Sequence, residues 1–465
     1  MRLLPVGQMG GLAGIAQAEI VAARGGYPNL YSSVRGNEFD VKDFGPVGTS
    51  DDTATFQAAV NFASALGGGI VNYGGGTFLL DGLVMRNGVT LQGAGTTRSY
   101  LKAKSGGAAA AVLLLDIGPV QGMWVQDCTV VPNGNAGQMG IYFQSVASTG
   151  SPFHGGWWYG GLRRVTVNGF AWHNIWLRGG GVSSLLPHQF LELDLVQSYC
   201  SATGSALLMT GQVGQVNFIG GEYDGPGLAS GTTNKVNIRL YREVQNDGIT
   251  VVSDEHPYAI NLLGVTTQSN KQGILIDRAN PVSILGCYFE TIGQAITAQT
   301  SASMVIAEGC QFDNAGFVGD GSGYIVSTQG ITVVAFDHNE ISGNVETHFA
   351  NGSGSAIFLN GNLLAATEVS TGLTIQIAVA SNAIAMGLAK TALVNASANA
   401  IKNITSSLGV GEMLFVRATG GTILFDTSGN IWLGNHTGLI AGDSTACFIR
   451  FDLGGFIWNL VSVSA

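Results

Sequence analysis

The sequence predicts an all-β chain, namely a right-handed, single-stranded parallel β-helix with an N-terminal capping helix and a C-terminal antiparallel β-sandwich-like module. Three observations predict this fold: short β-branched strands recur, glycines separate them, and charged residues are scarce. Glycine accounts for 70 of 465 residues, with no Gly-X-Y period, and charged residues account for only 11%. An average soluble domain has about half that share of glycine and about 25% charged residues. A stack of uncharged β-coils with tight corners explains both departures.

The first regular element is a capping helix, expected at about residues 52–66. Three apolar residues recur at helical spacing and form one narrow stripe: Phe56, Val60 and Ala63. Asp51 and Asp52 are expected to cap the start of the helix, and Gly67 is expected to end it. A β-solenoid needs such a lid, because its first coil otherwise exposes both its core and its strand edges.

The body of the β-helix is expected at residues 40–364, where repeats of about 20–30 residues indicate a solenoid. Segments with the same apolar pattern align with one another at 216–224, 282–290, 305–313 and 332–340. The separation of 66 residues between positions 216 and 282 predicts three coils of 22 residues. Short, largely apolar strands of this kind are what a parallel coil buries.

The two ends of the chain differ from this body in composition. Residues 1–39 are rich in glycine and alanine, and we expect a linker or attachment segment there. Their apolar run is interrupted, which argues against a conventional signal peptide, and no run is long enough to span a membrane. Residues 365–465 are expected to form the C-terminal module, with antiparallel strands and tight turns after residue 410.

Composition also limits the classes of ligand. A net charge of −10 argues against nucleic-acid binding, which requires a basic surface. The five cysteines are widely spaced and include no C-x-x-C pair, which argues against zinc and redox motifs. Cys287 and Cys310 are expected to be inward-facing thiols on successive coils rather than a disulfide. The histidines are dispersed, so we expect no metal site and no cofactor.

The first candidate site is aromatic. Five rings of the segment between residues 157 and 176 are the candidates for substrate binding: Trp157, Trp158, Tyr159, Trp172 and Trp176. Sugars present apolar C–H faces that pack on aromatic rings, so such a cluster suits a glycan groove. The alternative is that half of these rings fill the interior of the solenoid or a subunit interface.

The second candidate is a line of acids that ends successive coils: Asp224, Glu290, Asp313 and Glu340. Neighbouring coils stack at about 4.8 Å, so acids in register approach the separation of about 5–5.5 Å found in retaining glycosidases, or about 6.5–9.5 Å in inverting ones. Proximity also raises one pKa, which supplies an acid and a base at the same pH. We expect Glu222, Asp224 and Glu290 to be catalytic. The alternative is that each carboxylate accepts backbone N–H bonds at its own turn.

The third candidate is a charged segment in a chain that is otherwise poor in charge. Asp254 and Glu255, with His256, are candidates for general acid, general base and orienting partner. Arg242, His256 and Tyr258 are expected to contact the substrate. The alternative is a solvated turn.

Residues 41–95 resemble the N-terminal signature of the pectate-lyase-like right-handed parallel β-helix superfamily. The resemblance is carried by Val41-Lys42-Asp43-Phe44-Gly45, by the glycine-rich return from Gly67 to Phe78, and by Asn87 to Gly95. It is closest to the branch shared by phage tailspikes and polysaccharide depolymerases. Residues 420–433 resemble part of the small C-terminal β-sandwich that closes and trimerises phage tail proteins.

This resemblance implies a homotrimeric tailspike of the virion, or a secreted enzyme, that binds and depolymerises a bacterial surface polysaccharide such as a capsule or O-antigen. Residues 1–39 would then attach it to the phage baseplate. The carboxylates favour glycosidic hydrolysis. A polysaccharide lyase is the alternative enzyme, and its candidate groups are Arg239, Arg242 or Arg278 for a uronate and His256, Tyr258 or Lys271 as the base. A non-catalytic glycan-binding spike or adhesin is a further alternative, and a trimeric sugar transferase of the same fold is another. None of these involves nucleic acid or membrane insertion.

Overall fold

The structure is a computed structural model that describes residues 37–364, with short gaps, and separate strand segments between 367 and 464. The gaps before residue 364 lie at 117, 135–137, 146–155, 181–186, 201–203, 228–235, 246–249, 300–303, 317, 319–321, 330–331, 344, 346–348, 352–355 and 361. Almost all of the expected attachment segment, residues 1–36, lies outside the described residues.

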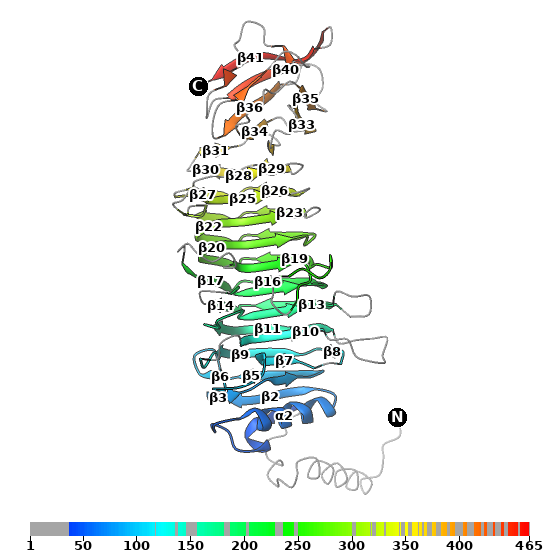
Figure 1. The fold of residues 1–465 in the computed structure, drawn as a ribbon, viewed down its shortest axis with the longest axis vertical. Helices are drawn as coiled ribbons and strands as arrows, with labels where there is room; N and C mark the ends of the chain where they lie inside the picture. Colours follow the sequence, from blue (N-terminus) through cyan, green and yellow to red (C-terminus); the bar gives the residue numbers. More distant parts are fainter. Residues whose placement is uncertain are drawn as a thin grey trace, which may run out of the picture.

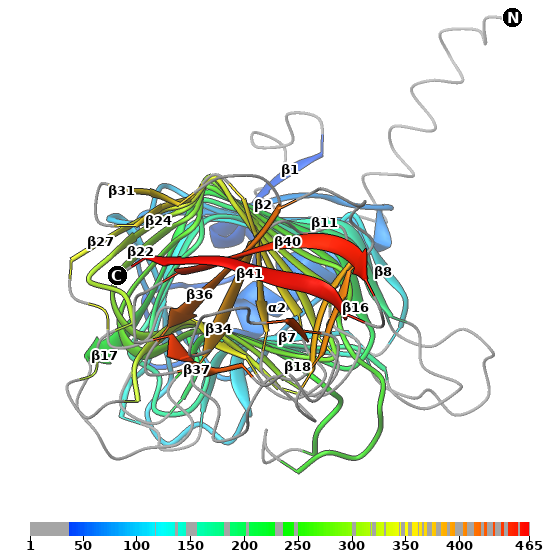
Figure 2. The ribbon, with the colours of Figure 1, turned by 90° about the horizontal axis from the view of Figure 1, so that it is seen from above.

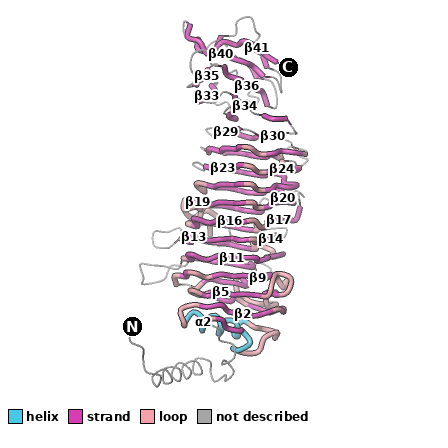
Figure 3. The backbone as a smooth tube through the Cα atoms, turned by 180° about the vertical axis from the view of Figure 1, so that it is seen from behind, coloured by secondary structure: helices cyan, strands magenta, loops and turns pink. Residues whose placement is uncertain are grey.

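Parallel strands stack into a long column, with helix α2 (Thr53–Ala65) at one end and the strands of the C-terminal segment at the other (Figure 1). Viewed down the column, the strands of successive coils superimpose around a common interior (Figure 2). From behind, the same strands lie one above another from α2 upwards (Figure 3). The predicted parallel β-helix is therefore confirmed.

The coils build three ladders of parallel strands, which we call the first, second and third faces. The first face contains β1 (Glu38–Asp40), β2 (Gly69–Gly74), β5 (Val89–Gly93), β9 (Trp124–Val131), β11 (Trp157–Asn168), β13 (His188–Asp194), β16 (Val213–Ile219), β19 (Tyr258–Leu263), β21 (Val282–Leu285), β23 (Met304–Glu308), β26 (Val333–Asp337) and β29 (Ala356–Asn360). The short β8 (Val120–Gln121) also pairs with β11.

The second face contains β3 (Gly76–Leu80), β6 (Ser99–Ala103), the ends of β9 and β11, β14 (Gln197–Tyr199), β17 (Glu222–Gly227), β20 (Thr266–Asp277), β22 (Tyr288–Gln299), β24 (Gln311–Asp313), β27 (Glu340–Ser342) and β30 (Asn362–Leu364). The third face contains β4 (Leu83–Met85), β7 (Ala111–Leu115), β10 (Met139–Gln144), β12 (Ile175–Arg178), β15 (Leu207–Thr210), β18 (Val236–Tyr241), the ends of β20 and β22, β25 (Tyr324–Thr328) and β28 (Phe349–Asn351).

Alternate side chains of each strand point into the column and stack on their counterparts in the next coil. Phe289 and Phe312, for example, are fully buried and stack with ring centroids 4.5 Å apart. Cys287 and Cys310 are also buried on successive coils, and both are free thiols, as predicted. Burial of apolar area contributes about 25 cal/mol per Å², so this continuous interior is the main source of stability.

Helix α2 closes the N-terminal end of the column, behind a 3-10 turn at Val41–Phe44. Its three stripe residues Phe56, Val60 and Ala63 are fully buried, as predicted, and Gly67 follows the helix with φ +90°. Asp52 is the N-cap residue, as predicted, and the Asp51 carboxylate accepts a hydrogen bond from the Thr53 N–H at 3.0 Å, but the Asp52 side chain makes no cap hydrogen bond. The Asp52 carboxylate instead accepts hydrogen bonds from the backbone N–H groups of Thr49 and Leu79, at 2.9 and 3.0 Å, and so fastens the helix to β3.

One coil is much longer than the repeats predicted. Val216 pairs with Ile260, 44 residues further along the chain, and Ile260 pairs with Val282 after another 22. The expected three coils of 22 residues are therefore two coils of unequal length. The additional residues include the charged segment between β18 and β19. We call this segment, which lengthens the coil without adding a first-face strand, the excursion.

After β30 the pairing changes. The remaining described strands are β31 (Thr367–Val369), β32 (Thr374–Ile377), β33 (Ala383–Gly387), β34 (Thr391–Asn395), β35 (Asn403–Ser406), β36 (Met413–Thr419), β37 (Ile423–Leu424), β38 (Ile431–Trp432), β39 (Leu439–Ile440), β40 (Thr445–Leu453) and β41 (Phe456–Ser464). β40 pairs antiparallel with both β36 and β41, unlike the described strand pairs of the column before β29. β34 nevertheless pairs parallel with β32 and β36, and β38 pairs parallel with β41, so the described strands after β30 are mixed rather than purely antiparallel as expected. A trimerisation role for residues 365–465 stays a prediction.

In the part of the chain that the structure describes, no helix combines the length and the apolar character needed to cross a membrane.

Candidate functional site

Sharp corners join the first face to the second face in eight successive coils. The corner residue has a left-handed backbone with φ between 49° and 64° in every coil: Asp127, Arg164, Leu195, Gly220, Gly264, Gly286, Gly309 and His338. Such a residue turns the chain within one position, at low cost for glycine and at some cost for others. The corner at Gly220 brings the end of β16 directly into β17.

Two carboxylates lie on the same side of β17. Glu222 and Asp224 alternate with Tyr223, whose ring is fully buried in the column. Successive side chains of a strand point to opposite faces, so both carboxylates point outward on the second face. Asp224 is nevertheless only 9% exposed.

Neighbouring coils hold this pair from both sides. On the coil before it, the Tyr199 hydroxyl donates a hydrogen bond to Glu222 Oε2 at 2.8 Å. On the coil after it, Gln268 Nε2 donates to Asp224 Oδ2 at 2.9 Å and also to Glu222 Oε1. One amide group therefore bridges the two carboxylates, which fixes their separation. We call Tyr199, Glu222, Asp224 and Gln268 the carboxylate cluster.

The surroundings of Asp224 favour its neutral form. Its pKa is raised to about 7, chiefly by burial and also by the negative charge of Glu222, while the hydrogen bond from Gln268 partly opposes both effects. Asp224 Oδ1 is buried and has no hydrogen-bond partner among the described residues. A carboxyl that keeps its proton near neutral pH beside a second carboxylate is the arrangement required for acid–base chemistry.

The other acids of the predicted line fall into two groups. Asp224, Gln268, Glu290 and Asp313 are in register on four successive coils, so Asp224 and Glu290 are two coils apart. Glu340 is out of this line, because it pairs with Gln311, and its place beside Asp313 is taken by Ser342. Glu290 lies on the same face as the carboxylate cluster and pairs in register with its member Gln268.

Asp254 lies in a different environment. Its side chain is 68% exposed and its carboxylate is 2.7 Å from Arg278 and 3.5 Å from Arg242. These guanidinium groups, chiefly that of Arg278, lower the pKa of Asp254. Arg242 is also bound to the fully buried Asp277 at 2.7 Å. A carboxylate held ionised in this way is a poor general acid.

The residues that follow Asp254 are engaged separately. Glu255 accepts a hydrogen bond from Gln212 Nε2 at 2.7 Å, and His256 Nδ1 lies 2.8 Å from the Asp254 carbonyl oxygen. Tyr258 lies on the first face, where its hydroxyl accepts a hydrogen bond from Gln189. The structure therefore does not bring Asp254, Glu255 and His256 together as a proton-transfer trio.

The predicted role of two tryptophans in substrate binding is wrong. Trp157 and Trp176 are fully buried. Trp157 packs edge-on against Phe143, and its Nε1 donates to the Met123 carbonyl oxygen at 3.2 Å. Trp176 lies on the third face, where Trp172 packs against it with ring centroids 5.5 Å apart. Trp157 and Trp176 therefore fill buried space between side chains, which is the alternative role given above.

Tyr159, in contrast, is 60% exposed and faces solvent. Its ring stacks on that of Phe190, which is 43% exposed, with centroids 4.9 Å apart and planes 5° apart. Trp158, next to it on β11, is half-buried. Both Tyr159 and Phe190 have a left-handed backbone, with φ 54° and 57°, and the same conformation continues in register at Gln215 and Ala259.

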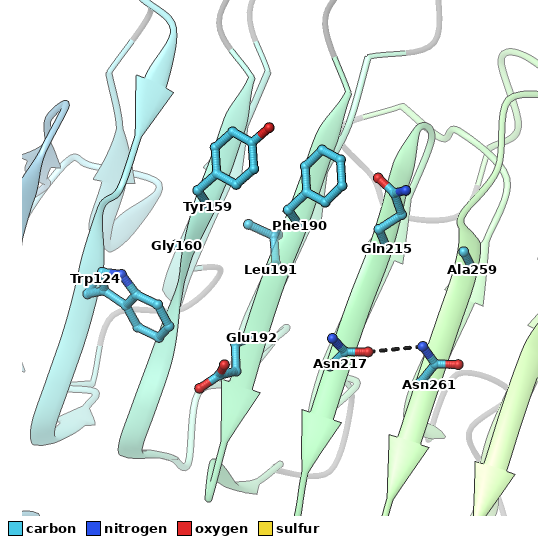
Figure 4. Close-up of a pocket in the computed structure, with 10 residues that line it drawn as sticks. All are labelled: Trp124, Tyr159, Gly160, Phe190, Leu191, Glu192, Gln215, Asn217, Ala259 and Asn261. Atoms are coloured by element: carbon cyan, nitrogen blue, oxygen red, sulfur yellow. Dashed lines mark hydrogen bonds between the residues drawn. The ribbon is translucent and has the colours of Figure 1, made fainter.

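A hollow of about 430 Å³ lies beside these rings on the first face. Its other side is a row of side chains in register, one per coil, at Trp124, Glu192, Asn217 and Asn261, with Gly161 in the coil between the first two. Figure 4 shows the two rows, with the hydrogen bond of 2.9 Å from Asn261 Nδ2 to Asn217 Oδ1. We call this hollow the aromatic–amide groove.

One cation borders the groove. The Arg163 guanidinium lies over the Trp124 ring, 4.9 Å from its centroid. It donates to Glu192 Oε1 at 2.7 Å and to Asp194 Oδ2 at 2.9 Å. Its charge is therefore already compensated by two carboxylates.

Comparison with known proteins places the fold. Residues 39–156 match the family described as rhamnogalacturonase A/epimerase, pectate lyase-like. The tailspike gp49 of Acinetobacter baumannii bacteriophage Fri1, a capsular polysaccharide depolymerase, superposes with a TM-score of 0.52 at 13% identity. The chain therefore shares the parallel β-helix fold of this tailspike. The superposition covers 71% of this chain and 59% of the tailspike, so the match spans little more than half the length of that protein.

A second structure, the A-module of a mannuronan C-5 epimerase from Azotobacter vinelandii, aligns with a TM-score of 0.44 at 17% identity, over 82% of this chain and 98% of that module. No protein of curated function matches the chain in sequence.

The sequence did not indicate the second row of the groove, nor Tyr199 and Gln268 of the carboxylate cluster. Trp124, Asn217 and Asn261 occupy the same position of their coils, and aligning all first-face strands would have found them. Gln268 was missed because it is uncharged, although it lies in register with Asp224.

Proposed function

We propose that this chain is a phage tailspike that binds and depolymerises a bacterial surface polysaccharide, a capsule or O-antigen, by glycosidic hydrolysis. The observation that carries the proposal is the carboxylate cluster, in which Asp224 retains its proton to about pH 7 beside Glu222. The shared fold supports the class of substrate, since a solved tailspike with this fold is described as a capsular polysaccharide depolymerase.

Each member of the cluster has a defined role in this proposal. Asp224 donates its proton to the glycosidic oxygen as the bond from that oxygen to the anomeric carbon breaks. Glu222 either takes a proton from the water that attacks the anomeric carbon or attacks that carbon itself. Tyr199 and Gln268 are positioning residues, because they hold the Glu222 oxygens by hydrogen bonds.

The β-elimination alternative has less support. It requires a cation that neutralises a uronate carboxylate, and the predicted arginines are engaged elsewhere. Arg242 and Arg278 bind Asp254, and Arg239 is 5% exposed with its guanidinium over the Tyr241 ring, 4.1 Å from the centroid.

As a tailspike, the protein would act as a homotrimer in the virion, with residues 1–39 at the baseplate and residues 365–465 at the closed end. These assignments rest on the sequence resemblance and on the change of strand pairing after β30.

The test is the chemistry of the products. The native protein is incubated with capsule and O-antigen preparations, and new reducing ends, chain length and ultraviolet absorbance are followed. Hydrolysis gives shorter chains and reducing ends without absorbance from a new double bond. Glu222→Gln and Asp224→Asn are expected to slow the loss of chain length and the gain of reducing ends by about 100-fold or more, while the protein still binds. A double-bond signal supports the lyase, and binding with unchanged chain length supports a non-catalytic spike.

A further inference from the structure

We propose that the aromatic–amide groove is a second glycan site, separate from the carboxylate cluster, and that it binds an uncharged polysaccharide strand rich in hydroxyl and N-acetyl groups. This inference deepens the proposed function, on which it rests for the presence of a glycan substrate. It assigns the charge class of that substrate and the residues that hold it.

The stacked rings supply a platform for a sugar. The left-handed backbone at Tyr159 and Phe190 turns both side chains out of the column, although the residues between the rows, such as Leu191, are buried. On the coil before Tyr159 the neighbouring position is Gly122, which has open space where a side chain would stand. One face of the Tyr159 ring is therefore open to the C–H face of a sugar, which is the surface that aromatic rings bind.

The opposite row supplies hydrogen-bonding groups without charge. Asn217 and Asn261 each carry both donors and acceptors, and Gln215 adds a third amide in the row of the rings. After the hydrogen bond between the two asparagines is counted, the Asn217 amino group and the Asn261 carbonyl oxygen stay available. Paired donors and acceptors of this kind suit hydroxyl and acetamido groups.

The electrostatics disfavour an anionic strand. The ten residues that line the hollow include a carboxylate, Glu192, and neither lysine nor arginine. The adjacent Arg163 is bound to Glu192 and Asp194, so this group of three carries a net negative charge. Among the described residues that line the groove, a uronate or phosphate group finds no uncompensated cation, and a buried or partly buried charge without a partner is costly.

The position of the groove relates it to the proposed chemistry. Asn217 of the groove and Glu222 of the carboxylate cluster belong to the same coil, separated by the corner at Gly220. Asn261 and Gln268 bear the same relation on the next coil, across Gly264. A strand held in the groove therefore lies one corner away from the carboxylates, which suits a site that retains a long polymer between cleavage events.

The experiment measures binding without turnover. The Glu222→Gln protein is titrated with purified bacterial polysaccharides, one group uncharged and N-acetylated and the other containing uronate or phosphate, at low and high salt. We expect the bound polysaccharide to be uncharged and its affinity to be unaffected by salt, since screening acts only on charge–charge attraction. Binding confined to acidic polysaccharides, or to none of the uncharged ones, overturns the inference.

Three further substitutions in the same background locate the site. Tyr159→Ala is expected to weaken binding about tenfold, because it removes the ring on which the C–H face of a sugar packs, and Tyr159→Phe is expected to retain binding. The matched control is Met304→Ala, since Met304 is 48% exposed on the same face and lies outside the hollow. If Tyr159→Ala binds as tightly as Met304→Ala, the inference is overturned.

These results are independent of the hydrolysis test. If the native protein cleaves no glycan but Tyr159→Ala still loses binding, the proposed function fails and the groove remains a glycan site. If short oligosaccharides are cleaved normally and Tyr159→Ala binds polymer as the parent does, only the groove assignment fails.

Discussion

Two acidic regions of this molecule contain similar residues and have opposite electrostatics. Asp224 is 9% exposed, lies beside Glu222, and has a pKa raised to about 7. The Asp254 side chain is 68% exposed, lies between two guanidinium groups, and has a lowered pKa. The difference shows that the neighbours of a carboxyl, more than its position near a coil end, decide whether it can donate a proton.

The environments of Asp224 and Asp254 differ because Asp224 lies on a strand of the column, whereas Asp254 lies in a segment that leaves it. Asp224 is part of β17, so adjacent coils place Tyr199 and Gln268 at hydrogen-bonding distance from its strand. Asp254 belongs to the excursion between β18 and β19, where it pairs with Arg242, which directly follows β18, and Arg278, which directly follows β20. We therefore expect catalysis in the first region and structural support in the second.

The largest expected effect is on activity. Asp224→Asn is expected to lower kcat by about 10²- to 10⁴-fold, the usual contribution of a positioned acid, whereas Asp254→Asn is expected to change kcat less than twofold. Reducing-end assays on the same polysaccharide measure both. Equal losses in the two variants would falsify the distinction between the regions.

The next effect is on stability and concerns the second region. Asp277→Asn removes the charge that binds Arg242 Nε at 2.7 Å in a fully buried position, and we expect the free energy of unfolding to fall by about 1.5–3 kcal/mol. Urea denaturation measures this loss, and kcat at a temperature where the variant is folded is expected to stay unchanged. A stable variant with lost activity contradicts the structural role.

The third effect is a pH dependence that belongs to the first region alone. As pH rises through about 7, Asp224 loses its proton, so kcat is expected to fall on that limb. The folded pKa lies above the unfolded value of about 3.9, so between about pH 4 and pH 7 the folded state holds a proton that the unfolded state has lost. The Asp224 contribution to stability therefore decreases as pH rises through this window.

Unfolding by urea at several pH values, with native protein and Asp224→Asn, isolates this slope. The variant is expected to lack it, while Asp254→Asn keeps it. A slope that is the same in native protein and Asp224→Asn assigns it to other groups.

Much of the column could be predicted from local patterns. The spacing of Phe56, Val60 and Ala63 predicts the buried face of the capping helix. The aligned segments around Cys287 and Cys310 predict two stacked coils. Both predictions are possible because each pattern involves only a few consecutive residues. The aromatic site could be predicted only in part. Nothing in the sequence distinguishes Trp157 from Tyr159 as a substrate-binding residue. In the structure Tyr159 has a left-handed backbone, which turns its side chain outward, while Trp157 stays buried. A left-handed conformation at a non-glycine residue is not predictable from the residue type.

The sequence by itself determined that this chain is a capped β-solenoid with carboxylates and aromatic rings along its coils, since strand periodicity and glycine corners are local properties. The tertiary structure alone decided which of those side chains meet. Contacts between coils depend on register, and register depends on the length of every excursion, as in the 44 residues between Val216 and Ile260. That length sets the register in which Gln268 lies beside Asp224. It also places Asp254 outside the column, where it pairs with Arg242 and Arg278.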